Sequence, residues 1–150
     1  MLFRSLLQTR APAAVVVDRA FHDAYRAGLG LPVGPLDLVV TETAANGRRF
    51  VAPEGGSRVL RIGPEVSPEE AHGEFIGIAL FSAGGAAALR TVRDELAAER
   101  AEGLERASVP RVIQALVDRD LPVIAADIHQ GWMEIDSFED YRRAWAEVAR

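Results

Sequence analysis

Short apolar runs alternate along this chain with longer amphipathic stretches. Residues 13–18, 74–81 and 121–127 are apolar runs of strand length, and residues 36–43 and 58–62 predict two further strands. Runs of this kind, without polar alternation, are typical of strands that are buried on both faces of a sheet. The pattern therefore predicts a sheet that is covered by helices.

Helical spacing of apolar residues fills the intervals between the predicted strands. It predicts helices over residues 83–101 and from Ser108 onward, with Ser82 and Ser108 as N-caps. Ser137 begins a last helix, and Asp140 completes an approximate capping box. We expect this helix to bury one stripe of side chains, made of Phe138, Tyr141, Trp145 and Val148.

Glycine, proline and asparagine mark the predicted connections. Asn46-Gly47 predicts a tight hairpin turn, with residues 49–52 as the returning strand. Ser67-Pro68 predicts a short helix, and Gly131 predicts a turn into a short strand over residues 132–135. An apolar stripe also predicts a helix over residues 2–8.

Together these elements predict an α/β fold, a mostly parallel sheet with helices on both faces and a hairpin insertion. A length of 150 residues is enough to bury one core. We therefore expect residues 1–150 to form a single domain.

Composition excludes several kinds of chemistry. The chain has no cysteine, which removes thiolate catalysis and cysteine-based zinc sites and suits a cytoplasmic protein. All 17 basic residues are arginine, so no lysine can bind phosphate or form a Schiff base. The net charge of −5 and the scattered arginines argue against a nucleic-acid partner. No apolar run approaches the ~20 residues that span a membrane, so we expect no membrane partner.

Three motifs carry a resemblance to a known family. They are Gly73-Glu74-Phe75-Ile76-Gly77, Phe81-Ser82, and Trp132-Met133-Glu134-Ile135-Asp136. Together they resemble the C-terminal part of the nucleotidyltransferase family, above all the phosphocholine and phosphonate cytidylyltransferases and the sugar-phosphate nucleotidyltransferases. Residues 15–18 and 61–63 resemble intermediate segments of the same family more weakly.

The resemblance implies a partial Rossmann-like fold and a transfer reaction. Members move a nucleoside monophosphate from a nucleoside triphosphate to a small phosphorylated or phosphonate acceptor. The resemblance to the cytidylyltransferases implies that the triphosphate is CTP. A Mg²⁺ ion bridges the phosphates and neutralises their charge. Asp136 matches a metal-binding and catalytic aspartate of the family, and Glu134, two residues earlier on the same predicted strand, supports it. Independently of the family, a strand-end acid beside a helix N-terminus lies where α/β proteins bind ligands.

The resemblance also implies an acceptor site. Glu74 matches a position that lines the acceptor pocket, where a carboxylate suits a cationic head group or a sugar hydroxyl. Asp18 ends a strand on the acceptor side, and Trp132 is a candidate pocket wall. Each residue has a simpler interpretation. Asp136 suits the dipole of the following helix, Glu74 suits a solvated strand start, Asp18 suits a turn, and Trp132 suits the core.

The chain departs from the family in one large respect. It has no glycine-rich loop of the Gly-x-Gly-x-Arg kind and no lysine to follow such a loop. We therefore expect a truncated form, whose enzymatic activity stays open. Its expected partners are the nucleoside triphosphate, the acceptor, and either a second copy in a homodimer or a chain that supplies the N-terminal half. An uncovered sheet edge would invite such pairing. The alternative is a non-catalytic remnant that acts as a small-molecule-binding or dimerisation module.

Overall fold

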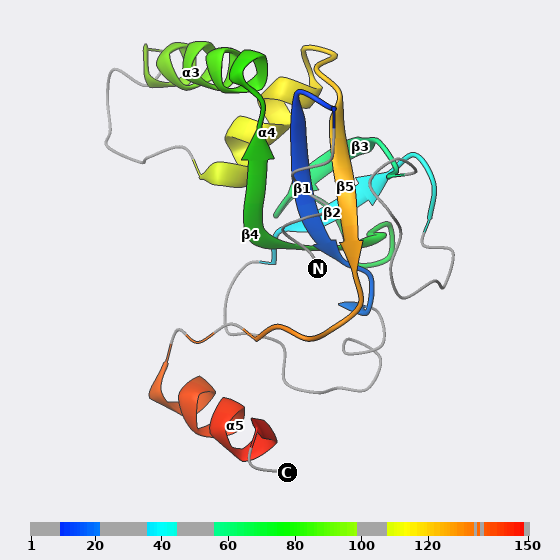
Figure 1. Ribbon diagram of the computed structural model, residues 1–150, viewed down its shortest axis with the longest axis vertical. Coiled ribbons are helices and arrows are strands. Elements are labelled where there is room, and N and C mark those ends of the chain that lie inside the picture. The colour runs from blue at the N-terminus through cyan, green and yellow to red at the C-terminus, as the bar shows by residue number, and fades with distance from the viewer. Residues whose placement is uncertain are drawn as a thin grey trace.

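The computed structural model describes residues 10–21, 36–44, 56–98, 108–133, 135 and 137–148. The predicted helix over residues 2–8 and the predicted hairpin at Asn46-Gly47 lie outside these residues. The elements, in chain order, are β1 (Ala13–Asp18), β2 (Leu38–Thr41), β3 (Val59–Gly63), β4 (Gly73–Phe81), α3 (Ala83–Ala98), α4 (Val109–Val117), β5 (Val123–Ile128) and α5 (Phe138–Val148) (Figure 1).

The five strands form one mixed sheet in the order β3-β2-β4-β1-β5. Only β1 and β5 pair in parallel, whereas β1 with β4, β2 with β4 and β2 with β3 are antiparallel. The α/β class is confirmed, but the prediction of a mostly parallel sheet is wrong.

Strand β4 lies between β1 and β2 and is antiparallel to both, which makes the sheet mostly antiparallel. Strands β3 and β4 flank β2 and run in the same direction, but the connection between them is not the helical crossover that usually joins such strands. Residues 64–72 contain no helix. The predicted helix after Ser67 is a turn in which the backbone N–H groups of Glu70 and Ala71 both donate to the Ser67 carbonyl, each at 3.1 Å.

The sheet curls until its two edge strands meet. Arg58, at the start of β3, forms an antiparallel bridge with Ile124 of β5, and the Ala125 N–H donates to the Ser57 carbonyl at 2.9 Å. Strand β4 is sharply bent (Figure 1). Gly77, at the register shift against β1, has a φ of +81°, which an L side chain rarely adopts. The two edges of the sheet are therefore partly paired with each other.

Both helices that follow β4 cover the same face of the sheet. Val92 of α3 and Ile113 and Leu116 of α4 join one buried cluster with the inward residues of all five strands. Helix α3 comes so close to the start of β1 that a Cβ on Gly85 would collide with the carbonyl of Pro12. Among the described elements, the expected second layer of helices on the opposite face is not found.

The opposite face, which we call the outer face, carries a second, smaller apolar cluster. Its buried members come from β1 and β5 and are Ala14, Val16, Ala126 and Ile128. The partly buried residues that pack against them are Trp132 and, from β4, Ile76, Ile78 and Leu80. The two clusters divide the alternating residues of β1 between them. Asp18, at the end of the strand, therefore points to the face that carries Trp132.

The region after β5 differs most from the sequence prediction. Residues 132, 133 and 135 are not in a strand. Helix α5 begins as predicted, because the Ser137 N–H donates to the Asp140 carboxylate at 2.9 Å and the Asp140 N–H donates to Ser137 Oγ at 3.2 Å. The prediction that its aromatic stripe is buried is wrong, since Phe138 is 77%, Tyr141 50% and Trp145 66% exposed.

Helix α5 lies apart from the sheet in Figure 1, and its three aromatic rings contact one another in sequence. Helical spacing predicts correctly that these rings share a face. It contains no information about what covers that face. In the described part of the chain, no helix is long and apolar enough to cross a membrane.

Candidate functional site

The ends of three strands meet at one edge of the sheet, which we call the carboxyl edge. Strands β1 and β5 are parallel, and β2 runs in the same direction because both β1 and β2 are antiparallel to β4. Strand β4 starts at this edge. In α/β sheets, ligands bind beyond the carboxyl ends of parallel strands, so the polar side chains gathered here form the candidate site.

Asp18 ends β1 and is only 7% exposed. Its Oδ1 accepts hydrogen bonds from the backbone N–H of Ala20 at 2.8 Å and of Gln130 at 3.0 Å. Its Oδ2 accepts one from the indole Nε1–H of Trp132 at 2.7 Å. The bond to Ala20 is the local turn that a strand-end aspartate favours, whereas the other two connect opposite ends of the chain.

A sharp turn brings Trp132 back to Asp18. Gln130 has a φ of +58° and Gly131 a φ of +88°, so two successive residues adopt the left-handed region. The predicted turn at Gly131 is confirmed. As a result, one carboxylate receives both the Gln130 backbone N–H and the Trp132 side chain. Trp132 is half-buried and packs against the apolar cluster of the outer face.

Glu74 lies opposite Asp18 in the pairing of β4 with β1, so the two side chains share a face of the sheet. Glu74 is half-buried. The preceding residue, Gly73, allows the two strands to approach closely, since a Cβ there would lie 2.6 Å from both the Asp18 carbonyl oxygen and Val17 Cγ1. Three of the predicted site residues, Asp18, Glu74 and Trp132, thus meet at the carboxyl edge.

The sequence prediction missed a second group of residues at this edge. The side chain of Arg19 is only 4% exposed, and its Nε donates to Asp127 Oδ1 at 2.8 Å. Its Nη1 donates to Thr41 Oγ1 at 3.0 Å and to the His72 carbonyl at 3.1 Å. Arg19 therefore connects the ends of β1, β2 and β5 with the segment that leads into β4.

The hydrogen bonds of His72 define its tautomer. The Thr41 backbone N–H donates to His72 Nδ1 at 3.1 Å, so this ring nitrogen carries no proton in this arrangement. The neutral ring then carries its proton on Nε2. His72 is half-buried and forms part of the network around Arg19.

Burial raises the pKa of the Asp127 carboxyl above its ordinary value, and the charge and hydrogen bond of Arg19 offset part of this rise. Desolvation therefore outweighs the attraction between the two side chains. Because Asp127 alternates with Ala126 and Ile128 along β5, it points to the helix-covered face, away from Trp132.

The predicted metal site is not represented by the described residues. Asp136 and Glu134 lie outside them, and within the described ranges no group of three histidines and acids could hold a metal ion. Asp18 does not fit the role of a replacement ligand, because N–H donors approach both of its oxygens.

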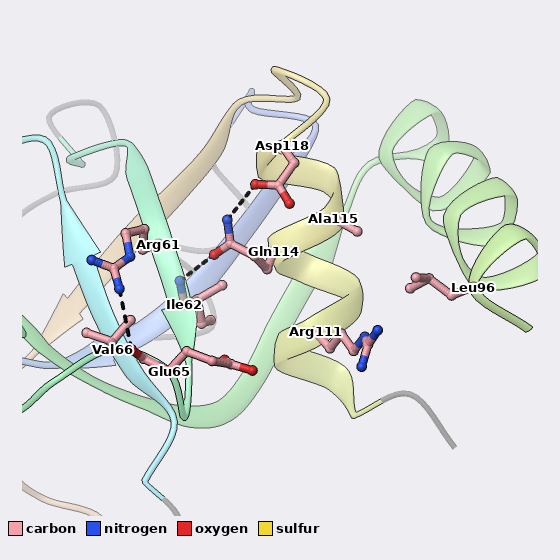
Figure 2. Close-up of a pocket in the computed structure, with 9 residues that line it drawn as sticks. All are labelled: Arg61, Ile62, Glu65, Val66, Leu96, Arg111, Gln114, Ala115 and Asp118. Carbon is pink, nitrogen blue, oxygen red and sulfur yellow. Dashed lines mark hydrogen bonds between the residues drawn. The ribbon is translucent and has the colours of Figure 1, made fainter. Parts of the chain in front are cut away.

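A hollow of about 380 Å³ lies on the helix-covered face, between β3 and α4 (Figure 2). Gln114 crosses it, accepting from the Ile62 N–H at 2.7 Å and donating to Asp118 at 2.8 Å. Its lining combines two arginines with two acids, Arg61, Arg111, Glu65 and Asp118. Because these charges balance, the hollow does not indicate a ligand of either sign, and the carboxyl edge is the stronger candidate.

No protein-family model, curated protein or solved structure matches this chain. The functional argument therefore depends on the residues of the carboxyl edge.

Proposed function

We propose that this chain binds a small phosphorylated or phosphonate acceptor that carries a cationic head group, as the acceptor-binding half of a metal-dependent nucleotidyltransferase. One observation carries the proposal. Asp18, Glu74 and Trp132 are far apart in the sequence and come together at the carboxyl edge, on one face of the sheet.

The chemistry of Glu74 and Trp132 suits a cationic head group. An indole attracts a cation to its ring face, and the attraction is strongest where water is excluded. Trp132 is half-buried, and Glu74 brings a carboxylate to the same face. A quaternary ammonium cannot donate hydrogen bonds, so an aromatic face with a nearby negative charge is a suitable environment for it.

The transfer step belongs to the same proposal. A nucleoside triphosphate such as CTP would supply the nucleoside monophosphate, and Mg²⁺ would neutralise the phosphates, with Asp136 as its predicted ligand and Glu134 in a supporting role. The residues of the carboxyl edge would hold the acceptor in position, which lowers the entropic part of the barrier. No covalent intermediate with the protein is required.

Isothermal titration calorimetry with phosphocholine tests the proposed binding. We expect Glu74→Gln and Trp132→Ala each to weaken binding about tenfold, because each removes one attraction for the cation. Glu139→Gln is the matched control, since it removes the same charge on α5, away from the sheet (Figure 1). Absence of heat with the parent chain, at millimolar phosphocholine with CTP and Mg²⁺ present, would refute the proposal.

A second candidate is a non-catalytic module that binds a small molecule or dimerises. The observation that favours it is that the carboxylate of Asp18 accepts hydrogen bonds from Gln130 and Trp132 of the chain itself. Pyrophosphate release from CTP in the presence of phosphocholine separates the two candidates. Binding without release, also after Mg²⁺ is added, favours the module. Sedimentation velocity tests the predicted homodimer and the predicted pairing with an N-terminal-half chain.

A further inference from the structure

We infer that Asp18 is a positioning residue, which fixes the indole of Trp132 and does not itself contact the acceptor. The identity of the acceptor rests on the proposed function, whereas the link between Asp18 and Trp132 rests on geometry alone. This assignment differs from the sequence prediction, in which Asp18 is a member of the acceptor pocket.

Both oxygens of the Asp18 carboxylate are already used within the chain. Oδ1 accepts from two backbone N–H groups and Oδ2 accepts from the indole N–H, all within 3.0 Å. The residue is only 7% exposed. A ligand cation would therefore compete with these donors for a buried carboxylate, and each donor that it displaced would lose a charge-assisted hydrogen bond.

Trp132 needs such a constraint because it does not belong to a helix or strand. It follows two residues with positive φ, and its backbone does not set the direction of its ring. Two contacts do so instead. The ring packs against the outer-face cluster, and its single N–H donates to Asp18 at 2.7 Å. Together these contacts fix both the depth and the rotation of the indole.

The two acids of the edge therefore have different tasks. Glu74 supplies charge close to the ligand. Asp18 acts through Trp132, by holding the ring so that its exposed part lies on the face that Glu74 shares. If this is correct, the loss of Asp18 has no further effect on binding once the indole N–H is gone.

The variants that test this inference are Asp18→Asn, Trp132→Phe and their combination. The Asn side chain keeps an oxygen for the backbone N–H groups of Ala20 and Gln130. Its amide group then faces the indole N–H, and two donors cannot bond to each other. Trp132→Phe keeps an aromatic face but removes the donor. Trp145→Phe serves as the background, because Trp145 is the only other tryptophan.

Two measurements are made on each variant. In the absence of ligand, we expect Asp18→Asn to shift the Trp132 emission to longer wavelength and to lower its anisotropy, since the ring gains freedom and water. In titrations with phosphocholine, we expect Asp18→Asn and Trp132→Phe each to raise Kd about tenfold, and the double variant to raise it no more than Trp132→Phe does.

Each outcome decides a separate point. Losses that multiply in the double variant would mean that Asp18 contacts the ligand, and would overturn the inference. Unchanged emission in Asp18→Asn would also overturn it. A shifted emission, with no phosphocholine binding by any variant or by the parent, would support the positioning role and refute the proposed acceptor.

A measurement on the unaltered chain covers the case in which Asp18→Asn does not fold. We expect the indole N–H of Trp132 to exchange with solvent much more slowly than that of exposed Trp145, as followed by two-dimensional ¹H–¹⁵N spectra. Equal exchange rates for the two indoles would contradict the hydrogen bond on which the inference depends.

Discussion

Arg19 and Asp127 form a largely buried ion pair in which the two charges behave differently. Arginine keeps its proton in proteins, so Arg19 is a permanent buried cation, whereas Asp127 can take up a proton. Burial raises the pKa of Asp127 despite the presence of Arg19. The negative charge of Asp127 therefore contributes less to the stability of the folded state than the hydrogen bond that its oxygen accepts from the Arg19 Nε–H.

Substitutions of Asp127 separate charge from hydrogen bonding. We expect Asp127→Asn to change the free energy of unfolding at neutral pH by less than about 1 kcal/mol, because its amide oxygen still accepts from Arg19. Asp127→Leu leaves a buried guanidinium donor without its acceptor and should cost about 3 kcal/mol. Urea denaturation measures both. Equal losses in the two variants would show that the charge itself is required.

The raised pKa of Asp127 also predicts a dependence of stability on pH. Above the ordinary aspartate pKa of 3.8, the folded state keeps a proton that the unfolded state has released. The unfolded state then binds fewer protons, so the contribution of Asp127 to stability falls as pH rises through the raised pKa. The difference in unfolding free energy between the parent chain and Asp127→Asn isolates this contribution. We expect the free energy of unfolding of the parent chain, minus that of Asp127→Asn, to fall as pH rises, and a rise in this difference would contradict the prediction.

At the scale of elements, the close approach of α3 to the start of β1 sets a strict requirement for glycine. A Cβ on Gly85 would collide with the backbone of Pro12, which cannot move without displacing β1. Gly84, the preceding residue, has only Ser82 Oγ, at 3.9 Å, near the position of its Cβ. Two adjacent glycines in one helix thus differ completely in their surroundings.

Alanine at these two positions gives opposite predicted effects. We expect Gly85→Ala to lower the free energy of unfolding by about 2 kcal/mol through overpacking. Gly84→Ala should raise it by about 0.5 kcal/mol, since alanine favours the helix. Thermal or urea unfolding of both variants tests this pair, and a destabilised Gly84→Ala would show that helix propensity does not decide the result there.

The elements themselves were largely predictable, because apolar periodicity and serine caps depend on neighbours in the sequence. Strands β1 to β5 and helix α3 begin and end within a few residues of the prediction, and helices α4 and α5 begin where the serine caps predict. Strand direction was not predictable in the same way. It depends on which strands become neighbours, and nothing within the predicted strand indicates that β4 lies between β1 and β2 and opposes both.

At the scale of the whole molecule, the carboxyl edge combines residues from five separate segments. Asp18, Glu74 and Trp132 could be selected in advance only because a family resemblance named them. Arg19, Thr41 and His72 could not, since their relation is created by tertiary pairing and has no spacing in the sequence. A buried arginine also looks the same in the sequence as the many arginines at the surface.

The strand order has a consequence for how the chain acquires its structure during synthesis. Strand β1 leaves the ribosome first, yet its neighbours β4 and β5 come from the middle and the end of the chain. Contacts between such distant segments form late, because the intervening polymer must first be confined. The continuous apolar sequence of β1 therefore has no partner strand in the nascent chain until β4 has been synthesised, and its second edge stays unpaired until β5 follows.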